Sequence, residues 1–274
     1  GEYYDAESGF IYLRNRYYDP ATGRFITEDP AKDGVNWYVY CEGNPINFID
    51  TLGLMPTAME AAEMAEHIYY DYGTSHSQEQ RTVAGWRLID IYKKGSFKMG
   101  VYIRDGDDWR NPSEYCLVSR ETTDAKGSGN DWDDNLLQPI GGSGDMRLSL
   151  DIAKWFSDSH ANQEITFVGH SKGGGEAMAN AVATNRNAIT FNPAKANLPA
   201  YGLGKAKKSY SETMIHYVVK GEILNSLFRD ASIGTTVKLP TQVPIQGNVK
   251  EVFDKSIENH HMWAVKAALK QKGY

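Results

Sequence analysis

The hydrophobic positions after residue 54 follow two different periods that alternate along the chain. Short β-branched and aromatic runs predict strands over residues 97–103, 114–119, 164–168, 188–191 and 214–219. Apolar residues at helical spacing predict helices that begin near Pro56, near Asp145 and after Ser171, and a last one over residues 256–271. This alternation predicts an α/β fold with a mostly parallel sheet and helices on both faces.

Two of these helices carry apolar stripes that predict which side faces the sheet. In the helix from about Asp145, the residues expected to point inward are Leu148, Ile152, Trp155 and Phe156. In the helix after Ser171, the stripe consists of Ala177, Met178, Ala181 and Val182. In the helix near Pro56, we expect the proline to occupy the first turn, where its missing N–H costs nothing.

A Gly-x-Ser-x-Gly motif, Gly169-His170-Ser171-Lys172-Gly173, joins the strand over 164–168 to the next helix. A serine becomes a nucleophile where a sharp strand-to-helix turn lifts its hydroxyl to within reach of a base. Gly169 and Gly173 fit the crowded turn, and the first N–H groups of the helix point at the reacting centre. The motif predicts a serine hydrolase with Ser171 as nucleophile; the alternative is a glycine-rich turn around an idle serine.

Residues 1–54 have a different pattern from the rest of the chain. The sequence Tyr-Tyr-Asp-Ala-Glu-Ser-Gly-Phe at 3–10 is echoed by Tyr-Tyr-Asp-Pro-Ala-Thr-Gly-Arg-Phe at 17–25. Each copy sets Asp before a turn and Gly near its end, between aromatic strand formers, which predicts stacked β-hairpins. We therefore expect two units, residues 1–54 and residues 55–274.

Five motifs of the first unit carry a family resemblance. They are Tyr-Leu-Arg-Asn-Arg-Tyr-Tyr-Asp-Pro-x-Thr-Gly-Arg-Phe-Ile (12–26), Glu-Asp-Pro (28–30), Asn-Trp-Tyr-Val-Tyr (36–40), Gly-Asn-Pro (43–45) and Asp-x-Leu-Gly-Leu (50–54). Together they resemble the end of the conserved core in Rhs, or YD-repeat, proteins. The resemblance implies a β-shell formed by an N-terminal region absent here, a toxin domain after it, and self-cleavage after Leu54 by Asp29 and Asp50. Turn formation is the other interpretation of these two aspartates.

The second unit resembles a class 3, or fungal-type, lipase domain. The motifs are Ser119-Arg120-Glu121-Thr122, Asp131-Trp132-x-x-Asn135-Leu136, the Gly-x-Ser-x-Gly turn at 169–173 (hereafter the elbow), and Thr190-Phe191-Asn192-Pro193. The family usually has Phe-Arg-Gly-Thr for the first, so Ser119 and Glu121 depart from its pattern. The resemblance implies an α/β-hydrolase fold, no metal or cofactor, and an oxyanion hole formed by Thr122 and the backbone N–H of Lys172.

The same resemblance implies an acid and a base after the elbow, in the order Ser, acid, His. The residue at the position of the acid is Glu222, after the strand over 214–219, and the alternative is Asp230. The residue at the position of the base is His260, and the alternative is His261. Helical spacing within residues 256–271 places His261 on the packed stripe and leaves His260 to point elsewhere.

The composition of the chain opposes some classes of binding partner and of metal site. A net charge of −6 opposes nucleic-acid binding, and two cysteines form neither a disulfide framework nor a zinc site. The chain opens at Gly1 without an apolar leader, so we expect a piece of a longer protein that is secreted or delivered into a target cell by a secretion system.

These observations predict a toxin that hydrolyses lipid carboxylic esters, most simply as a phospholipase A that damages the membrane surface of the target cell. The resemblance implies two further partners, a cognate immunity protein and the Rhs shell. The alternatives are a catalytically degenerate binding module, which the departures at Ser119 and Glu121 would explain, and a nuclease toxin that uses Asn259-His260-His261 to hold a metal. The acidic charge opposes the nuclease.

Overall fold

The computed structural model describes residues 3–12, 16–28, 38, 55–70, 81–120, 144–224 and 233–274. The N-terminal part forms an antiparallel four-stranded sheet in chain order, with strands β1 (Tyr3–Tyr4), β2 (Ile11–Tyr12), β3 (Tyr17–Asp19) and β4 (Arg24–Phe25). Asp5 and Asp19 accept hydrogen bonds from backbone N–H groups two residues on, and Gly9 and Gly23 have positive φ. The hairpins predicted from the repeat are therefore present.

The rest of the chain is organised around one eight-stranded sheet in the order β12-β11-β10-β9-β8-β7-β6-β5. Its strands are β5 (Thr82–Val83), β6 (Trp86–Lys94), β7 (Phe97–Arg104), β8 (Glu114–Arg120), β9 (Glu164–His170), β10 (Asn187–Phe191), β11 (Met214–Val219) and β12 (Thr235–Leu239). Strands β8 to β12 are parallel to one another, and β5 to β8 pair antiparallel. The sheet is mixed and mostly parallel, as the alternating pattern predicted.

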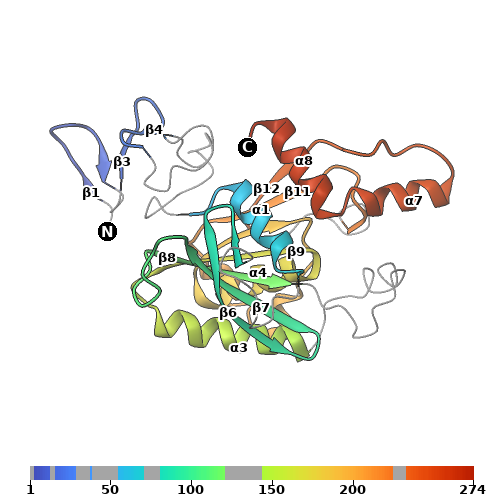
Figure 1. The fold of residues 1–274 in the computed structure, drawn as a ribbon, viewed down its shortest axis with the longest axis horizontal. Coiled ribbons are helices and arrows are strands. Elements are labelled where there is room, and N and C mark those ends of the chain that lie inside the picture. The colour runs from blue at the N-terminus through green and yellow to red at the C-terminus, as the bar shows by residue number, and fades with distance from the viewer. Residues whose placement is uncertain are drawn as a thin grey trace.

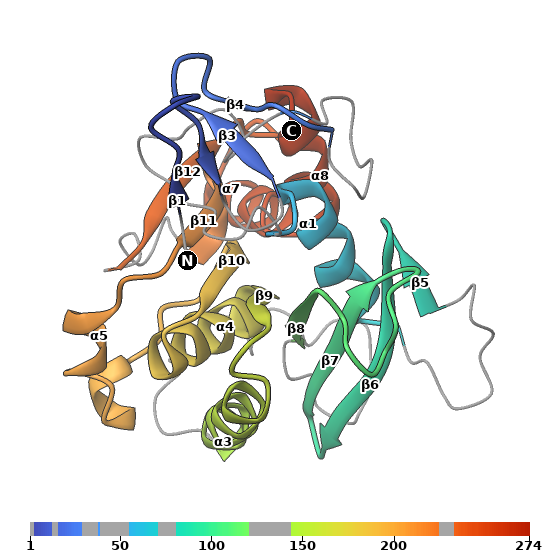
Figure 2. The ribbon, with the colours of Figure 1, turned by 90° about the vertical axis from the view of Figure 1, so that its left-hand side faces the viewer.

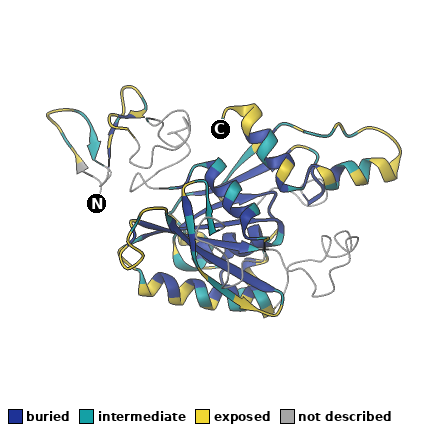
Figure 3. Cartoon of the chain, viewed as in Figure 1, coloured by how far each residue is buried: buried dark blue, intermediate teal, exposed yellow. Residues whose placement is uncertain are grey.

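Helices cover both faces of this sheet, which confirms the α/β-hydrolase class (Figures 1 and 2). Helices α1 (Ala58–His67) and α8 (Met262–Lys272) pack on one face, in a core that includes Tyr102, Val168 and Phe191. Helices α3 (Gly144–Ser159) and α4 (Ser171–Thr184) pack on the other, in a core that includes Leu117 and Phe167. The central parallel strands β9, β10 and β11 are consequently buried along their length (Figure 3).

The apolar stripe predicted for α4 is correct, because all four of its residues are buried. The stripe predicted for α3 is partly wrong. Phe156 is buried, but Trp155 is 57% exposed, and the inward face instead includes Met146, Leu150 and Ala153. Both Trp155 and Phe156 are apolar, so the sequence alone did not show which of the two neighbours points outward.

The first and last helices differ from the prediction at their ends. Helix α1 begins after the N-cap Thr57, whose side chain forms a capping box with Glu60, so Pro56 precedes the helix. The single helix expected over 256–271 is instead α7 (Val249–Glu258) and α8, separated by Asn259-His260-His261. Between β10 and β12 lie a short 3₁₀ helix, Leu198–Tyr201, and α5 (Ala206–Ser209).

Candidate active site

Five parallel strands, β8 to β12, end at the same edge of the sheet, and three of these ends carry the polar residues of the site. Strand β9 ends at His170 and continues directly into α4 at Ser171. The neighbouring β10 ends before Asn192, and β11 ends three residues before Glu222. Because the carboxyl ends of parallel strands meet at one edge, residues far apart in the sequence come together there.

The turn at Ser171 has the sharp geometry that the motif predicted. Ser171 has a φ of 55°, a strained value for a residue with a side chain. A Cβ on Gly169 would lie 2.2 Å from the Gly173 carbonyl oxygen, and a Cβ on Gly173 would lie 2.3 Å from the Ser119 oxygen. Glycine is therefore required at both positions by the close approach of backbone atoms.

His260 and Glu222 form a buried hydrogen-bonded pair. The His260 Nδ1 lies 2.6 Å from Glu222 Oε2, and the two side chains are 1% and 0% exposed. Glu222 Oε2 also accepts a hydrogen bond from the Leu224 backbone N–H. Since a carboxylate can only accept, Nδ1 carries the proton and the His260 Nε2 lone pair is available to take another.

The Ser171 hydroxyl and the His260 Nε2 are both buried, and neither has a hydrogen-bond partner in the part of the chain that the structure describes. They therefore do not hydrogen bond to each other. Catalytic hydrogen bonds of this kind are often long in the resting enzyme and shorten only when substrate binds. Each atom has the capacity that a nucleophile–base pair requires, since one is a donor and the other a bare acceptor.

Backbone and side-chain contacts hold His260 next to the elbow. The His260 carbonyl oxygen lies 2.8 Å from His170 Nε2 and 3.0 Å from Asn192 Nδ2. The rings of His170 and His260 are 4.8 Å apart between centroids. The Ser171 carbonyl, in turn, accepts from the Ala194 N–H. His260 is thus in contact with the residue that immediately precedes Ser171.

Several residues singled out by the sequence lie outside the described residues. These are Thr122, Asp230, Asp29, Asp50 and Leu54. Lys172 lies in the first turn of α4, where backbone N–H groups have no partner within the helix. The structure places His261 at the N-cap of α8, half-buried, whereas His260 is the residue that contacts Glu222. The break between α7 and α8 therefore distinguishes His260 from His261. The packed helical stripe expected from spacing is not what separates them.

The sequence did not indicate the contacts that Asn192 and Asn259 make around the site. Asn192 has a φ of 40°, donates to the His260 carbonyl and accepts from the Val219 N–H. Asn259 accepts from the N–H groups of Gln242 and Val243, which ties the helix break to the segment after β12. A signal existed for Asn192, because it stands where the resembling family usually has glycine, and asparagine tolerates positive φ.

The remaining described histidines each have a hydrogen-bonding partner; His67 and His216 are buried, and His160 is half-buried. His67 contacts the Tyr102 hydroxyl, His216 contacts Thr190 and the Ile233 carbonyl, and His160 contacts the Phe156 carbonyl. Among the described residues, no group of three or more His, Cys, Asp or Glu side chains is arranged to hold a metal ion. Across the same ranges, no helix combines the length and the apolar character needed to cross a bilayer.

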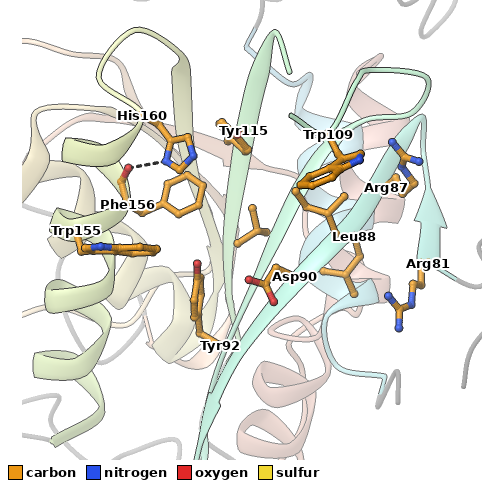
Figure 4. Close-up of a pocket in the computed structure, with 12 residues that line it drawn as sticks. Arg81, Arg87, Leu88, Asp90, Tyr92, Trp109, Tyr115, Trp155, Phe156 and His160 are labelled. Atoms are coloured by element: carbon orange, nitrogen blue, oxygen red, sulfur yellow. Dashed lines mark hydrogen bonds between the residues drawn. The ribbon is translucent and has the colours of Figure 1, made fainter. Parts of the chain in front are cut away.

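Two of the cavities on the described surface are relevant to the site. One of about 390 Å³ adjoins the elbow and is lined by Glu66, Tyr69, His170, His261, Met262 and Trp263. The other, of about 680 Å³, lies along β6 to β8 and the end of α3, with an aromatic wall that includes Trp109, Trp155 and Tyr92 (Figure 4). Of these two, the first touches the sheet edge that carries Ser171, where His170 forms part of its wall.

Comparison with known proteins separates the two parts of the chain. The N-terminal region matches YlbH of Escherichia coli K12 (54% identity over 57 residues, 20% of this chain and 24% of the relative). It also matches RhsB of Dickeya dadantii (44% over 61 residues, 22% and 4%) and the toxin protein Tse5 of Pseudomonas aeruginosa (42% over 57 residues, 20% and 4%). The matches therefore span a quarter or less of the length of these relatives.

A solved structure similar to the chain is the triacylglycerol lipase from Penicillium expansum, with a TM-score of 0.42 and 10% identity, over 67% of this chain and 78% of the lipase. At this level of similarity, the fold assignment rests on the sheet topology described above. A model of the Tle-like phospholipase domain matches residues 60–268, which is most of the chain. The chain therefore belongs to the phospholipase-like family, as a lipase-type hydrolase domain preceded by a region that matches Rhs toxins.

Proposed function

We propose that this chain is a toxin domain that hydrolyses carboxylic esters of glycerophospholipids, as a phospholipase A with a serine nucleophile. In this proposal Ser171 attacks the ester carbonyl and His260 Nε2 takes its proton, then returns it to the leaving alcohol, which leaves the acyl group on the serine. Water, deprotonated by the same imidazole, then attacks the acyl-serine, and the proton returns to the serine oxygen as the fatty acid is released. Glu222 holds the imidazole and stabilises the imidazolium. The Lys172 N–H and Thr122 donate to the oxyanion.

The observation that carries the proposal is the buried bond between His260 Nδ1 and Glu222 Oε2. It fixes the tautomer in which the base can accept a proton, and it occurs beside a serine on a strained strand-to-helix turn. A buried imidazole–carboxylate pair next to such a serine is the arrangement that acyl transfer requires. The phospholipase-like family supports a lipid as the substrate.

The surface next to the elbow also supports a lipid substrate. Tyr69 and Met262 line the smaller cavity, together with Trp263, which is 47% exposed. Apolar and aromatic side chains of this kind suit acyl chains, and aromatic residues are favoured where a protein meets the boundary between lipid and water.

Analysis of the products from diacyl glycerophospholipid vesicles tests the proposal. We expect free fatty acid and lysophospholipid from the wild type and neither from Ser171→Ala, because the serine oxygen is the attacking atom. Loss of product and loss of toxicity should coincide. Release of diacylglycerol or phosphatidic acid would instead show cleavage at the phosphate, and unchanged fatty-acid release by Ser171→Ala would exclude Ser171 as the nucleophile.

One observation favours a second candidate, a hydrolase fold that binds lipid without cleaving it. The Ser171 side chain is 0% exposed and makes no hydrogen bond to His260. A binding module would associate with the vesicles and leave their lipids intact. The same product analysis separates the two candidates, provided that vesicle binding is measured in parallel by sedimentation.

The proposal extends to the organisation of the longer protein. Residues 1–54 would form the end of an Rhs core and residues 55–274 the toxin, separated by cleavage after Leu54 through Asp29 and Asp50. The Rhs shell and a cognate immunity protein would be its partners, and a secretion system would deliver it. The two separate sheets support the division into two units.

A further inference from the structure

His170, the residue between Gly169 and Ser171, makes two hydrogen bonds that the proposed reaction does not itself require. The side chain is buried, at 2% exposure. Its Nε2 lies 2.8 Å from the carbonyl oxygen of His260, and its Nδ1 lies 3.1 Å from the hydroxyl of Tyr69. The imidazole, at the end of β9, therefore connects the turn after α1 to the backbone of the residue proposed as the base.

The partners fix the protonation of this ring. A carbonyl oxygen can only accept, so Nε2 must carry a proton and donate it to His260. Burial, together with the neighbouring His260, holds the pKa of His170 well below its usual range, so the ring stays neutral. Nδ1 is then bare and accepts from the Tyr69 hydroxyl, which makes this tautomer the one that both partners favour.

The His260 carbonyl oxygen accepts hydrogen bonds from residues at the ends of two strands. His170 donates to it from the end of β9, and Asn192 donates to it from the end of β10. The backbone of His260 lies in the short break between α7 and α8, where its N–H is bonded to the Ile257 carbonyl. The two donors therefore tie this break to the same sheet edge that carries Ser171.

We propose that His170 is a positioning residue for the base, which sets the place of the His260 imidazole relative to Ser171 by holding the His260 carbonyl, and that Tyr69 keeps His170 in the donating tautomer. This inference rests on the proposed function. A displacement of about 1 Å between reacting groups can cost about 100-fold in rate, so an anchor adjacent to the nucleophile has a measurable effect.

Two amide variants separate the donor from the rest of the side chain. His170→Gln places an amide nitrogen three bonds from Cβ, as Nε2 is in histidine, and keeps a donor for the His260 carbonyl. His170→Asn places its amide two bonds from Cβ, near the position of Nδ1, and cannot reach that carbonyl. Tyr69→Phe removes the hydroxyl alone and leaves both histidines in place.

The experiment measures the rate at which a fluorophosphonate labels Ser171, along with kcat and KM for phospholipid and the thermal unfolding midpoint. We expect His170→Asn to lower kcat and the labelling rate by about 10- to 100-fold with little change in KM. His170→Gln should retain most of both rates. Tyr69→Phe should cause a smaller loss than His170→Asn, because the ring can still adopt the donating tautomer.

Three results would overturn the inference. Wild-type rates in both amide variants would show that the hydrogen bond from His170 to the His260 carbonyl has no effect on the base. Equal losses in both variants would assign His170 a role in packing alone, and so would losses that follow the unfolding midpoint. Failure of the proposed function gives a different result, because the folded wild type would then not be labelled at Ser171 at all.

Discussion

Ser171 and Asn192, which directly follow the adjacent strands β9 and β10, adopt positive φ values of 55° and 40°. Such backbone costs about 1–3 kcal/mol per residue outside glycine and persists where surrounding structure enforces it. For Ser171 the enforcing contacts are those of the elbow glycines. For Asn192 they are the bonds to Val219 and His260. Both strained residues therefore serve the placement of one serine and one histidine.

The substitution Glu222→Gln tests the role of Glu222 as the acid that orients His260. A glutamine amide can donate to His260 Nδ1 and stabilise the wrong tautomer, whose Nε2 carries the proton. We expect kcat to fall by on the order of 10³- to 10⁴-fold, the size seen when an equivalent carboxylate becomes an amide in serine proteases. Ester hydrolysis at pH 7–8 measures it. Glu258→Gln, which changes an exposed carboxylate two residues before His260, should be unaffected.

An equal rate for Glu222→Gln and wild type would exclude Glu222 as the acid and make Asp230 the candidate.

The sequence predicted Ser171 from its own chemistry, whereas Glu222 and His260 followed from a family resemblance. Asn192 and Asn259 were not predictable in the same way, since their roles depend on contacts between segments that are far apart in the chain.

The position of helix α4 is set by the close approach of its first turn to strand β8. The Gly173 Cα faces the Ser119 carbonyl, and Gly174 faces Pro193 after β10. Because these neighbours are largely backbone, they cannot move aside as a flexible side chain could. The helix therefore reaches the reacting edge only with glycine in its first turn.

Gly173→Ala tests this close approach. An added Cβ would lie 2.3 Å from the Ser119 oxygen, so α4 or β8 must shift. We expect a loss of about 1–3 kcal/mol in the free energy of unfolding, although alanine is the better helix former. Denaturant unfolding measures it. The matched control is Gly204→Ala, where a Cβ meets nothing within 4 Å, and a loss equal to that of Gly173→Ala would contradict the account.

Periodicity predicted the buried strands well, because β8 to β11 are long apolar runs on both faces. It did not predict β6, which lies next to the edge strand β5. The residues of β6 range from buried (Trp86 and Leu88) to exposed, and its register is irregular between Leu88 and Asp90. It also joined α7 to α8, since apolar spacing continues across Asn259-His260-His261. The break depends on the contacts of Asn259 with residues 242–243, which spacing does not reveal.

For the whole molecule, the strand ends, the helix break and the elbow act as one unit. Residues from β9, β10, the turn after β11 and the start of α8 converge on His260 and Glu222. The cavity beside His170 lies at the same edge, between α1 and α8. In the proposed reaction, the ester of a lipid bound at this edge would come within reach of the Ser171 hydroxyl, the His260 imidazole and the backbone N–H groups in the first turn of α4.

The most direct test of the central claim is peptide mass spectrometry of the whole chain after treatment with a fluorophosphonate. The account predicts a single covalent adduct on Ser171, because only a serine activated by a base reacts readily with this probe. His260→Ala, shown to be folded by thermal unfolding, should give no adduct over the same time. A folded wild type without an adduct on Ser171, or a His260→Ala variant labelled as fast as wild type, would contradict the account.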